Sequence, residues 1–257
     1  MDHSSQIRMV NGAKIAVLFI HGIVGTPRHF SHVLPLVHHV PENMSFYNLR
    51  LPGHGGSVED FAKSSMQQWK AEVWKVFHQL AENHEKIVIV GHSMGTLVAL
   101  QLAVEFPDQV AFLFLIASPI RPWVSLKGIG CCLRASFGCA REDHPAEMAI
   151  LRAGGTKLTR KLWRYVPWTP HMSALLACAR QTEKRLPLLR TKTIVFQSRQ
   201  DEMVSLRSGK ILEQLSCVSL TTLPGSTHFY YPPIESEIVC SAFTDALTQL
   251  PNKRHAK

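Results

Sequence analysis

Short apolar runs alternate with longer stretches of helical period along most of the chain. Six of the runs are four to six residues long and are bounded by Gly, Pro, His or polar residues, which predicts strands. They are Ala16 to Ile20, Ser45 to Leu49, Ile87 to Val90, Ala111 to Ile116, Thr193 to Gln197 and Val218 to Thr222. Because strands that alternate with helices form βαβ units, the pattern predicts an α/β fold with a mainly parallel sheet.

Helical period is clearest between Met66 and Asn83. The apolar positions of this stretch, three or four residues apart, are Trp69, Val73, Val76, Phe77 and Leu80. They predict one apolar stripe on a long amphipathic helix. Further helices are predicted from Thr96 to Phe106, before Pro107, and from Glu235 to Leu250, after two prolines. We expect these helices to cover the faces of the sheet.

The alternation stops between Pro119 and about Leu189, where no run resembles a strand and helix-like pieces are broken by Gly and Pro. We therefore predict a single domain whose core comprises residues 1–118 and 190–257, with residues 119–189 as an inserted helical cap. Apolar side chains of the cap, among them Trp123, Phe137, Leu162 and Trp163, are expected either to line a pocket over the core or to pack onto it.

The sequence Gly91-His92-Ser93-Met94-Gly95 lies between a predicted strand and a predicted helix. This is the context of a nucleophile elbow, in which a serine occupies a strained turn and neighbouring glycines remove Cβ atoms that would clash. The turn also places the hydroxyl at a helix N-terminus, where unpaired N–H groups and the helix dipole favour an anion. Ser93 is therefore the predicted nucleophile.

A serine hydroxyl needs a base, and the base needs an acid that orients it. His228 follows the last predicted strand in a turn, Pro224-Gly225-Ser226-Thr227-His228, and is the predicted base. Asp201 follows the preceding strand and is the predicted acid, while Glu202 beside it is expected to face solvent. The order Ser, Asp, His along the chain fits an elbow serine.

A tetrahedral intermediate needs backbone donors for its oxyanion. The N–H of Met94, directly after the nucleophile, is one predicted donor. The other is the N–H of Ile23, in the glycine-containing loop His21-Gly22-Ile23-Val24-Gly25 after the first long strand.

These residues resemble the α/β-hydrolase fold family, and more narrowly its carboxylesterase and monoacylglycerol-lipase-like members. The matching motifs are His21-Gly22, Leu51-Pro52-Gly53-His54-Gly55, Gly91-His92-Ser93-Met94-Gly95, Asp201-Glu202-Met203 and Ser226-Thr227-His228. The resemblance covers about residues 15–118 and 192–250. It implies an α/β-hydrolase fold, a triad of Ser93, Asp201 and His228, and oxyanion donors at Ile23 and Met94.

The resemblance implies a serine hydrolase that cleaves a small-molecule carboxylic ester, with a small or medium-chain acyl group, through an acyl-enzyme. A thioesterase or acyltransferase would share the triad, and a catalytically silent ligand-binding protein would share the fold, so these alternatives stay open. A serine at the elbow argues against dehalogenation and epoxide opening, which the resemblance associates with aspartate at this position.

Charge is unevenly placed along the chain. From Pro119 to Lys192 there are 14 Lys and Arg against 4 Asp and Glu, so this segment holds the whole positive excess of +9. Three interpretations of this charge stay open, namely a solvated basic face, a peripheral contact of the cap with anionic lipid, and a funnel for an anionic ester. No nucleic-acid-binding motif accompanies the charge, so no nucleic-acid partner is expected, and the sequence predicts no oligomeric state.

The remaining patterns argue against several classes of protein. Cys131, Cys132, Cys139 and His144 lie close in sequence, but their spacing matches no zinc module, so no metal and no cofactor are expected. The N-terminus has no secretory signal pattern, and the longest apolar run, Val110 to Ala117, is far shorter than the roughly 20 residues of a membrane-spanning helix. These patterns predict a cytoplasmic protein with free thiols.

Overall fold

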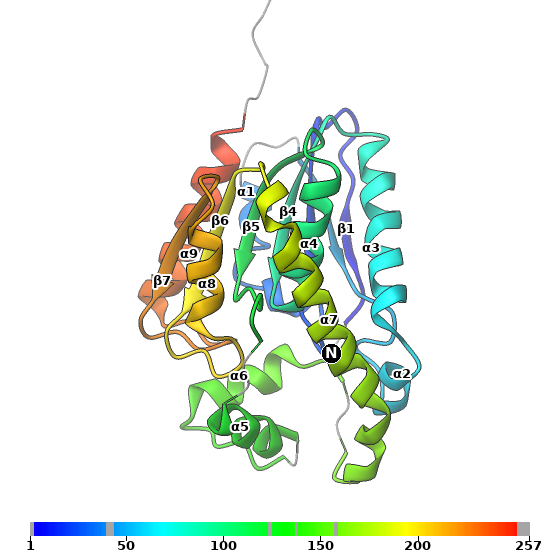
Figure 1. Ribbon diagram of the computed structural model, residues 1–257, viewed down its shortest axis with the longest axis vertical. Coiled ribbons are helices and arrows are strands. Elements are labelled where there is room, and N and C mark those ends of the chain that lie inside the picture. The colour runs from blue at the N-terminus through cyan, green and yellow to red at the C-terminus, as the bar shows by residue number, and fades with distance from the viewer. Residues whose placement is uncertain (1–2, 40–43, 123–124, 137, 157–158, 251–257) are drawn as a thin grey trace, which may run out of the picture.

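Seven strands form one sheet in the computed structural model, which describes residues 3–39, 44–122, 125–136, 138–156 and 159–250. The order across the sheet is β1-β3-β2-β4-β5-β6-β7 (Figure 1). The strands are β1 (Gln6–Arg8), β2 (Ile15–Ile20), β3 (Met44–Leu49), β4 (Lys86–His92), β5 (Val110–Ile116), β6 (Thr193–Ser198) and β7 (Val218–Leu223). β1 pairs antiparallel with β3, and every other pairing is parallel.

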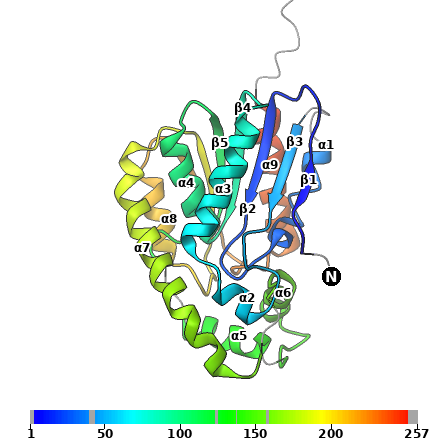
Figure 2. The ribbon, with the colours of Figure 1, turned by 90° about the vertical axis from the view of Figure 1, so that its right-hand side faces the viewer.

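Helices cover both faces of the sheet (Figure 2). The α-helices are α1 (Leu36–His39), α2 (Val58–Ala62), α3 (Met66–Ala81), α4 (Met94–Glu105), α5 (Leu126–Ser136), α6 (Pro145–Ala153), α7 (Thr169–Arg185), α8 (Leu206–Glu213) and α9 (Pro233–Thr248). Three 3-10 helices are η1 (Pro27–Phe30), η2 (Leu162–Trp168) and η3 (Leu186–Leu188). Because the central strands β2, β4 and β5 are covered on both faces, their sequences read as nearly unbroken apolar runs rather than as alternating ones.

Two apolar cores lie on the two sides of the sheet. One contains the predicted stripe of α3, with Trp69 and Phe77 fully buried, together with α4 and Leu212 of α8. The other contains Phe30 of η1 and Phe243 of α9. The α/β class with a mainly parallel sheet flanked by helices, predicted from the sequence, is confirmed, and so are all six predicted strands, which are β2 to β7.

Several short elements were not predicted. β1 has three residues, α1 four, α2 five and α8 eight. Windows this short hold too few apolar positions to distinguish one period from another. None of the helices in the described ranges has the length and apolar character that crossing a membrane requires.

Chain order reverses between β2 and β4 at the middle of the sheet. After β2 the chain adds β3 on one side, whereas after β4 it adds β5 on the other. Ile20 and Gly91 are paired at the carboxyl ends of these two strands. In open parallel sheets, ligands bind outside the carboxyl ends of the strands at such a reversal.

Between β5 and β6 the described residues form helices and no named strand. Figure 1 shows α5, α6 and the start of α7 beyond the carboxyl edge of the sheet. The later part of α7 lies against α4, where Gln101 Nε2 donates to Thr182 Oγ1 at 2.7 Å. Leu162 and Trp163 of η2 are 57% and 68% exposed, so neither packs onto the core. Trp123 and Phe137, also considered from the sequence, lie outside the described residues.

Several arginines of the positively charged segment, residues 119–192, form ion pairs with glutamates. The Glu147 side chain on α6 is fully buried, and Arg134 Nε and an Arg141 terminal nitrogen lie 2.6 and 3.0 Å from its Oε1. Arg121 pairs with Glu183 at 2.9 Å, and Arg164 pairs with Glu59 of α2 at 2.5 Å. Part of the local positive excess therefore holds the helices of this segment together and onto the core.

Two glycines let the helical segment between β5 and β6 approach the core closely. A Cβ atom at Gly128 would lie 2.6 Å from the carbonyl oxygen of Glu202, which also accepts the N–H of Ser125 at 2.9 Å. A Cβ atom at Gly155 would lie 1.9 Å from Cγ2 of Thr26, in the loop after β2. The segment is thus in close contact with two of the loops that follow strands of the sheet.

Candidate active site

Ser93 stands in the turn between β4 and α4, as the sequence predicted. Its φ of 54° and ψ of −126° are unfavourable for a residue with a side chain, at a cost of about 1–3 kcal/mol. The turn is held from both sides, because Ser93 N–H donates to Ile116 of β5 at 2.9 Å and Ser93 C=O accepts the N–H of Thr96 at 2.9 Å. The Ser93 hydroxyl is thereby fixed at the carboxyl end of the central strand.

The glycines of the motif are required by close approach. A Cβ atom at Gly91 would lie 2.8 Å from Thr96 Cα, and one at Gly95 would lie 1.9 Å from the carbonyl oxygen of Ile20. Both neighbours are backbone atoms, which cannot rotate away. Glycines at these two positions therefore allow α4 to start directly over the end of β2.

Replacing Gly95 with alanine is expected to destabilise the protein by about 3 kcal/mol or more, because backbone must shift to admit the new methyl group. Urea denaturation measures the loss. Gly130→Ala in α5 is the matched control, since a Cβ atom there meets only the Arg134 side chain at 3.5 Å. It should be neutral or stabilising by up to about 1 kcal/mol. Equal stability of the two variants would contradict the steric argument.

The loop after β2 runs directly beside Ser93. A Cβ atom at Gly22 would lie 2.8 Å from Ser93 Cβ and 3.4 Å from its Oγ. The loop turns sharply, because Gly25 N–H donates to Gly22 C=O at 3.1 Å and Val24 has a φ of 59°. Met94 is the first residue of α4, where backbone N–H groups lack helical partners. The N–H groups of Ile23 and Met94 stay the predicted oxyanion donors.

His228 and Asp201 meet at the same edge of the sheet. His228 Nδ1 lies 3.0 Å from Oδ1 and 2.9 Å from Oδ2 of Asp201, and both side chains are almost fully buried. The Asp201 carboxylate is fixed in turn, since Oδ1 accepts the N–H groups of Met203 and Val204 at 2.8 Å each. The predicted base and acid are therefore in contact, although 27 residues separate them in sequence.

His92 connects this pair to the elbow. It precedes Ser93, and its Nε2 lies 3.1 Å from the carbonyl oxygen of His228. The two imidazole rings lie 4.9 Å apart, centre to centre. The structure thus brings the loops of Ser93, Asp201 and His228 together, while the catalytic roles of these residues stay predictions.

Glu202 does not face solvent, contrary to the expectation from sequence. It is 4% exposed, and its Oε2 accepts the backbone N–H of His228 at 3.2 Å. Its side chain therefore helps to hold the loop of the predicted base. This role could not be predicted from the sequence, because glutamate in a loop is usually exposed to solvent.

Two carboxylates act on the His228 imidazole. Burial alone would lower the pKa of His228, but the negative charge and hydrogen bond of Asp201, together with the charge of Glu202, raise it above its ordinary value. The neutral form of His228, which can accept a proton, is therefore favoured only at a correspondingly higher pH.

Four more histidines lie buried near the reversal point. His21, His29, His54 and His92 are at most 7% exposed. Their rings form a connected series, with centre-to-centre distances of 4.9 Å for His54 and His21, 6.0 Å for His21 and His29, and 4.7 Å for His29 and His92. Burial lowers the pKa of His21 to about 4, and lowers the pKa values of the other three well below 6.5.

Because burial lowers the pKa values of these four histidines, we expect the protein to lose stability in acid. In the unfolded chain they titrate near pH 6.5, so between about pH 6.5 and 4 the unfolded state binds more protons and the free energy of unfolding falls as pH falls. Above pH 6.5 their contribution is fully present. Each excess proton contributes about 1.4 kcal/mol per pH unit to the slope. His228, whose pKa is raised, acts in the opposite direction, losing its contribution as pH rises through its folded pKa.

Urea denaturation across this pH range measures the slope. His54→Gln should reduce it by about 1.4 kcal/mol per pH unit, whereas His78→Gln, at an exposed position of α3, should leave it unchanged. A stability that does not vary over this pH range would contradict the burial argument.

A family model described as "Alpha/beta hydrolase family" matches residues 17–239. The chain belongs to this family. The match includes the loop of Ile23, the elbow and the loops of Asp201 and His228, so the resemblance inferred from the motifs is confirmed. Among the described residues of this hydrolase family member, no group of three or more His, Cys, Asp or Glu is arranged to hold a metal ion.

Curated relatives of this family member are similar over part of their length. A thermostable monoacylglycerol lipase of Bacillus sp. (strain H-257) is 30% identical over 114 residues, which cover 41% of this chain and 44% of the lipase. An acetyltransferase component of the acetoin cleaving system of Cupriavidus necator is 36% identical over 110 residues, 42% of this chain and 28% of that protein. The matched part is thus less than half of each of these two relatives.

Solved structures of similar fold include lipolytic enzymes. One, from work on the metagenome-derived lipolytic enzymes LipS and LipT, has a TM-score of 0.69 at 18% identity and covers 95% of this chain and 97% of its own. A monoacylglycerol lipase of Paleococcus ferrophilus has a TM-score of 0.64 at 15% identity, covering 96% and 99%. At these identities the likeness establishes the fold.

Proposed function

We propose that this family member hydrolyses carboxylic esters of small molecules, with small or medium-chain acyl groups, through an acyl-enzyme on Ser93. The observation that carries the proposal is the contact of His228 Nδ1 with Asp201 at 2.9 Å, next to a serine held in an elbow. The partial similarity to a monoacylglycerol lipase supports an ester as substrate.

In the first half of the proposed reaction, Ser93 Oγ attacks the ester carbonyl carbon and its proton passes to His228 Nε2. Asp201 holds Nδ1 and stabilises the imidazolium that forms. The N–H groups of Ile23 and Met94 donate to the oxyanion. As the tetrahedral intermediate collapses, the bond to the alcohol oxygen breaks and His228 returns the proton to the leaving alcohol.

In the second half, His228 removes a proton from a water molecule, whose oxygen attacks the acyl carbon. The bond to Ser93 Oγ then breaks, Ser93 regains its proton from His228, and the carboxylic acid leaves. No step needs a metal or a cofactor.

Active-site labelling and a substrate panel test the proposal. A fluorophosphonate probe should label the wild-type protein at Ser93, and p-nitrophenyl esters should be cleaved with a preference for short or medium acyl chains. Faster turnover of acyl thioesters than of esters would indicate a thioesterase, and transfer to an added alcohol in preference to water would indicate an acyltransferase. If the protein is not labelled and turns over none of these substrates, the proposal is rejected and a ligand-binding protein is the remaining alternative.

Glu202→Gln is expected to move the pH dependence of ester hydrolysis. Glutamine retains an oxygen for the N–H of His228 but removes a charge that raises the His228 pKa, so the acid limb of kcat/KM should move to lower pH. Activity at the plateau should fall by less than about tenfold. Glu213→Gln, at an exposed position at the end of α8, is the control. If the acid limb of the kcat/KM profile of Glu202→Gln stays at the wild-type pH, the Glu202 charge does not act on His228.

A further inference from the structure

Exposed apolar side chains gather on η2 and on the start of α7. Leu162, Trp163 and Val166 of η2 are 57%, 68% and 68% exposed, and Met172 and Leu176 of α7 are 41% and 45% exposed. In a 3-10 helix, side chains three residues apart lie above one another, so Trp163 and Val166 form one exposed ridge. Large apolar side chains gathered in one place indicate a surface that binds a partner, whereas single ones scattered over a protein do not.

The fold holds η2 in this orientation. Tyr165 and Trp168 of η2 are half-buried, and their rings lie 4.9 Å apart. The Tyr165 hydroxyl donates to the carbonyl oxygen of Thr159 at 3.0 Å, and Trp168 Nε1 donates to the carbonyl oxygen of Val58 in α2 at 3.1 Å. The exposed side chains of η2 are therefore presented by an element that is anchored to the core.

The chain around η2 is strongly positive. Residues 148–182 contain six Lys and Arg and no Asp or Glu. Lys161 directly precedes η2, and its Nζ lies 5.9 Å from the centre of the Trp163 ring. Lys63, which directly follows α2, is also exposed, and α2 packs against η2. Apolar and cationic side chains thus occur together on this part of the surface.

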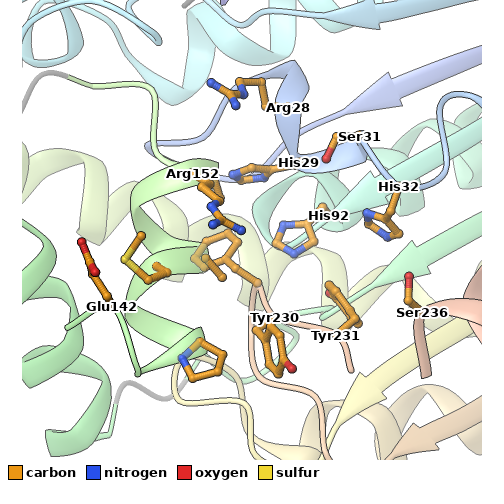
Figure 3. A pocket seen from close by; sticks show the side chains of 15 residues that line it. Arg28, His29, Ser31, His32, His92, Glu142, Arg152, Tyr230, Tyr231 and Ser236 are labelled. Carbon is orange, nitrogen blue, oxygen red and sulfur yellow. The ribbon is translucent and has the colours of Figure 1, made fainter. Parts of the chain in front are cut away.

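Other charges of these elements have partners or lie elsewhere. Arg152 lines a cavity of about 790 Å³ between α6 and η1 (Figure 3), and Arg164 pairs with Glu59 of α2. The second carboxylate of α2, Asp60, accepts the N–H and the hydroxyl of Ser57. The sequences of α2 and η2 contain no further acid, so the surface around η2 keeps a positive charge.

This surface lies at one end of the molecule. Figures 1 and 2 both show the start of α7, which directly follows η2, at the lower end and below α2. That end lies beyond the carboxyl edge of the sheet, where the loops of Ser93, Asp201 and His228 meet. A flat surface can therefore approach η2 from outside.

We propose that the η2 surface, formed by Leu162, Trp163 and Val166 together with Lys161, docks on a lipid bilayer that carries anionic headgroups. The apolar side chains enter the boundary between headgroups and acyl chains, where tryptophan is favoured, and Lys161 contacts lipid phosphate groups. A second copy of this chain is a poorer partner, because pairing through the same surface would bring like charges together. Docking does not rest on the proposed function.

Co-sedimentation of the full chain with vesicles tests the proposal. An equimolar mixture of phosphatidylcholine and phosphatidylserine should bind the protein about tenfold or more tightly than phosphatidylcholine alone, and added salt should reduce this difference. Trp163→Asp should weaken binding to the mixed vesicles about tenfold or more, because the largest apolar side chain of the η2 surface is lost. Leu188→Asp is the matched control, since Leu188 is 62% exposed but is separated from η2 by the roughly 25 Å length of α7.

A pair of charge reversals tests the electrostatic part. Lys161→Glu should weaken binding to the mixed vesicles about fivefold or more, because each cation near an anionic bilayer strengthens binding about fivefold. Lys210→Glu, at an exposed position of α8, changes the net charge equally and should change binding by less than about twofold. Circular dichroism of each variant should match that of the wild type, since all four positions are exposed.

Three results would overturn the proposal. They are no binding to the mixed vesicles, equal binding to both kinds of vesicle, and binding that Trp163→Asp leaves unchanged. Self-association of the wild-type protein in sedimentation velocity, lost in Trp163→Asp, would instead assign the η2 surface to a second copy of the chain. Because binding is measured without substrate, failure of docking is distinguishable from failure of ester hydrolysis.

Discussion

Ser93→Ala should reduce kcat/KM for a p-nitrophenyl ester by about 10⁴–10⁶-fold, the loss typical of removing a triad nucleophile. Without Oγ no acyl-enzyme forms, and what activity persists comes from binding and the oxyanion donors. The fold should persist, because the turn is held by backbone bonds to Ile116 and Thr96 that alanine retains. Labelling by a fluorophosphonate should disappear together with turnover.

Ser118→Ala is the matched control for this loss. Ser118 is fully buried, follows β5, and its hydroxyl has no hydrogen-bond partner in the protein. Its removal should leave most of the activity. Hydrolysis by Ser93→Ala at near the wild-type rate, with circular dichroism unchanged, would show that Ser93 is not the nucleophile.

Asp201→Asn should reduce kcat/KM by about 10⁴-fold at neutral pH. Oδ1 of Asp201 accepts the N–H groups of Met203 and Val204, so the asparagine oxygen should keep this place and its NH₂ group should face His228 Nδ1. An NH₂ donor at that position favours the tautomer with hydrogen on Nε2, which cannot accept the proton of Ser93. The pKa of His228 should fall as well, because the Asp201 charge raises it.

The pH dependence of the residual activity separates this explanation from a folding defect. Asp245→Asn, at an exposed position of α9, should leave the activity unchanged. Near-normal turnover by Asp201→Asn would indicate that another carboxylate orients the imidazole, and the buried Glu202 would then be the next candidate.

The sequence predicted the sheet and the elbow because both are local patterns. An apolar run such as Ile87 to Val90, followed by Gly-x-Ser-x-Gly and a helix, specifies a strand, a turn and a helix without reference to distant residues. The positions of Asp201 and His228 follow from chain order, since both lie in loops at the carboxyl ends of neighbouring parallel strands, β6 and β7.

Burial of polar side chains could not be predicted in the same way. His21, His29, His54 and His92 come from separate loops and strands and converge only where the chain order reverses. Glu202 is buried because its partner is a backbone N–H 26 residues away. The net charge of the 119–192 segment gives no sign that Glu147 is fully buried between Arg134 and Arg141.

The close contacts at Gly128 and Gly155 limit how this protein can be redesigned. A helical segment taken from a relative would need glycine at both places, because any side chain would displace the Glu202 carbonyl or Thr26. Displacement of the Glu202 backbone would also move the adjacent Asp201, which contacts His228. Grafting a new segment to change substrate specificity would therefore also alter the pH optimum, whatever the substrate.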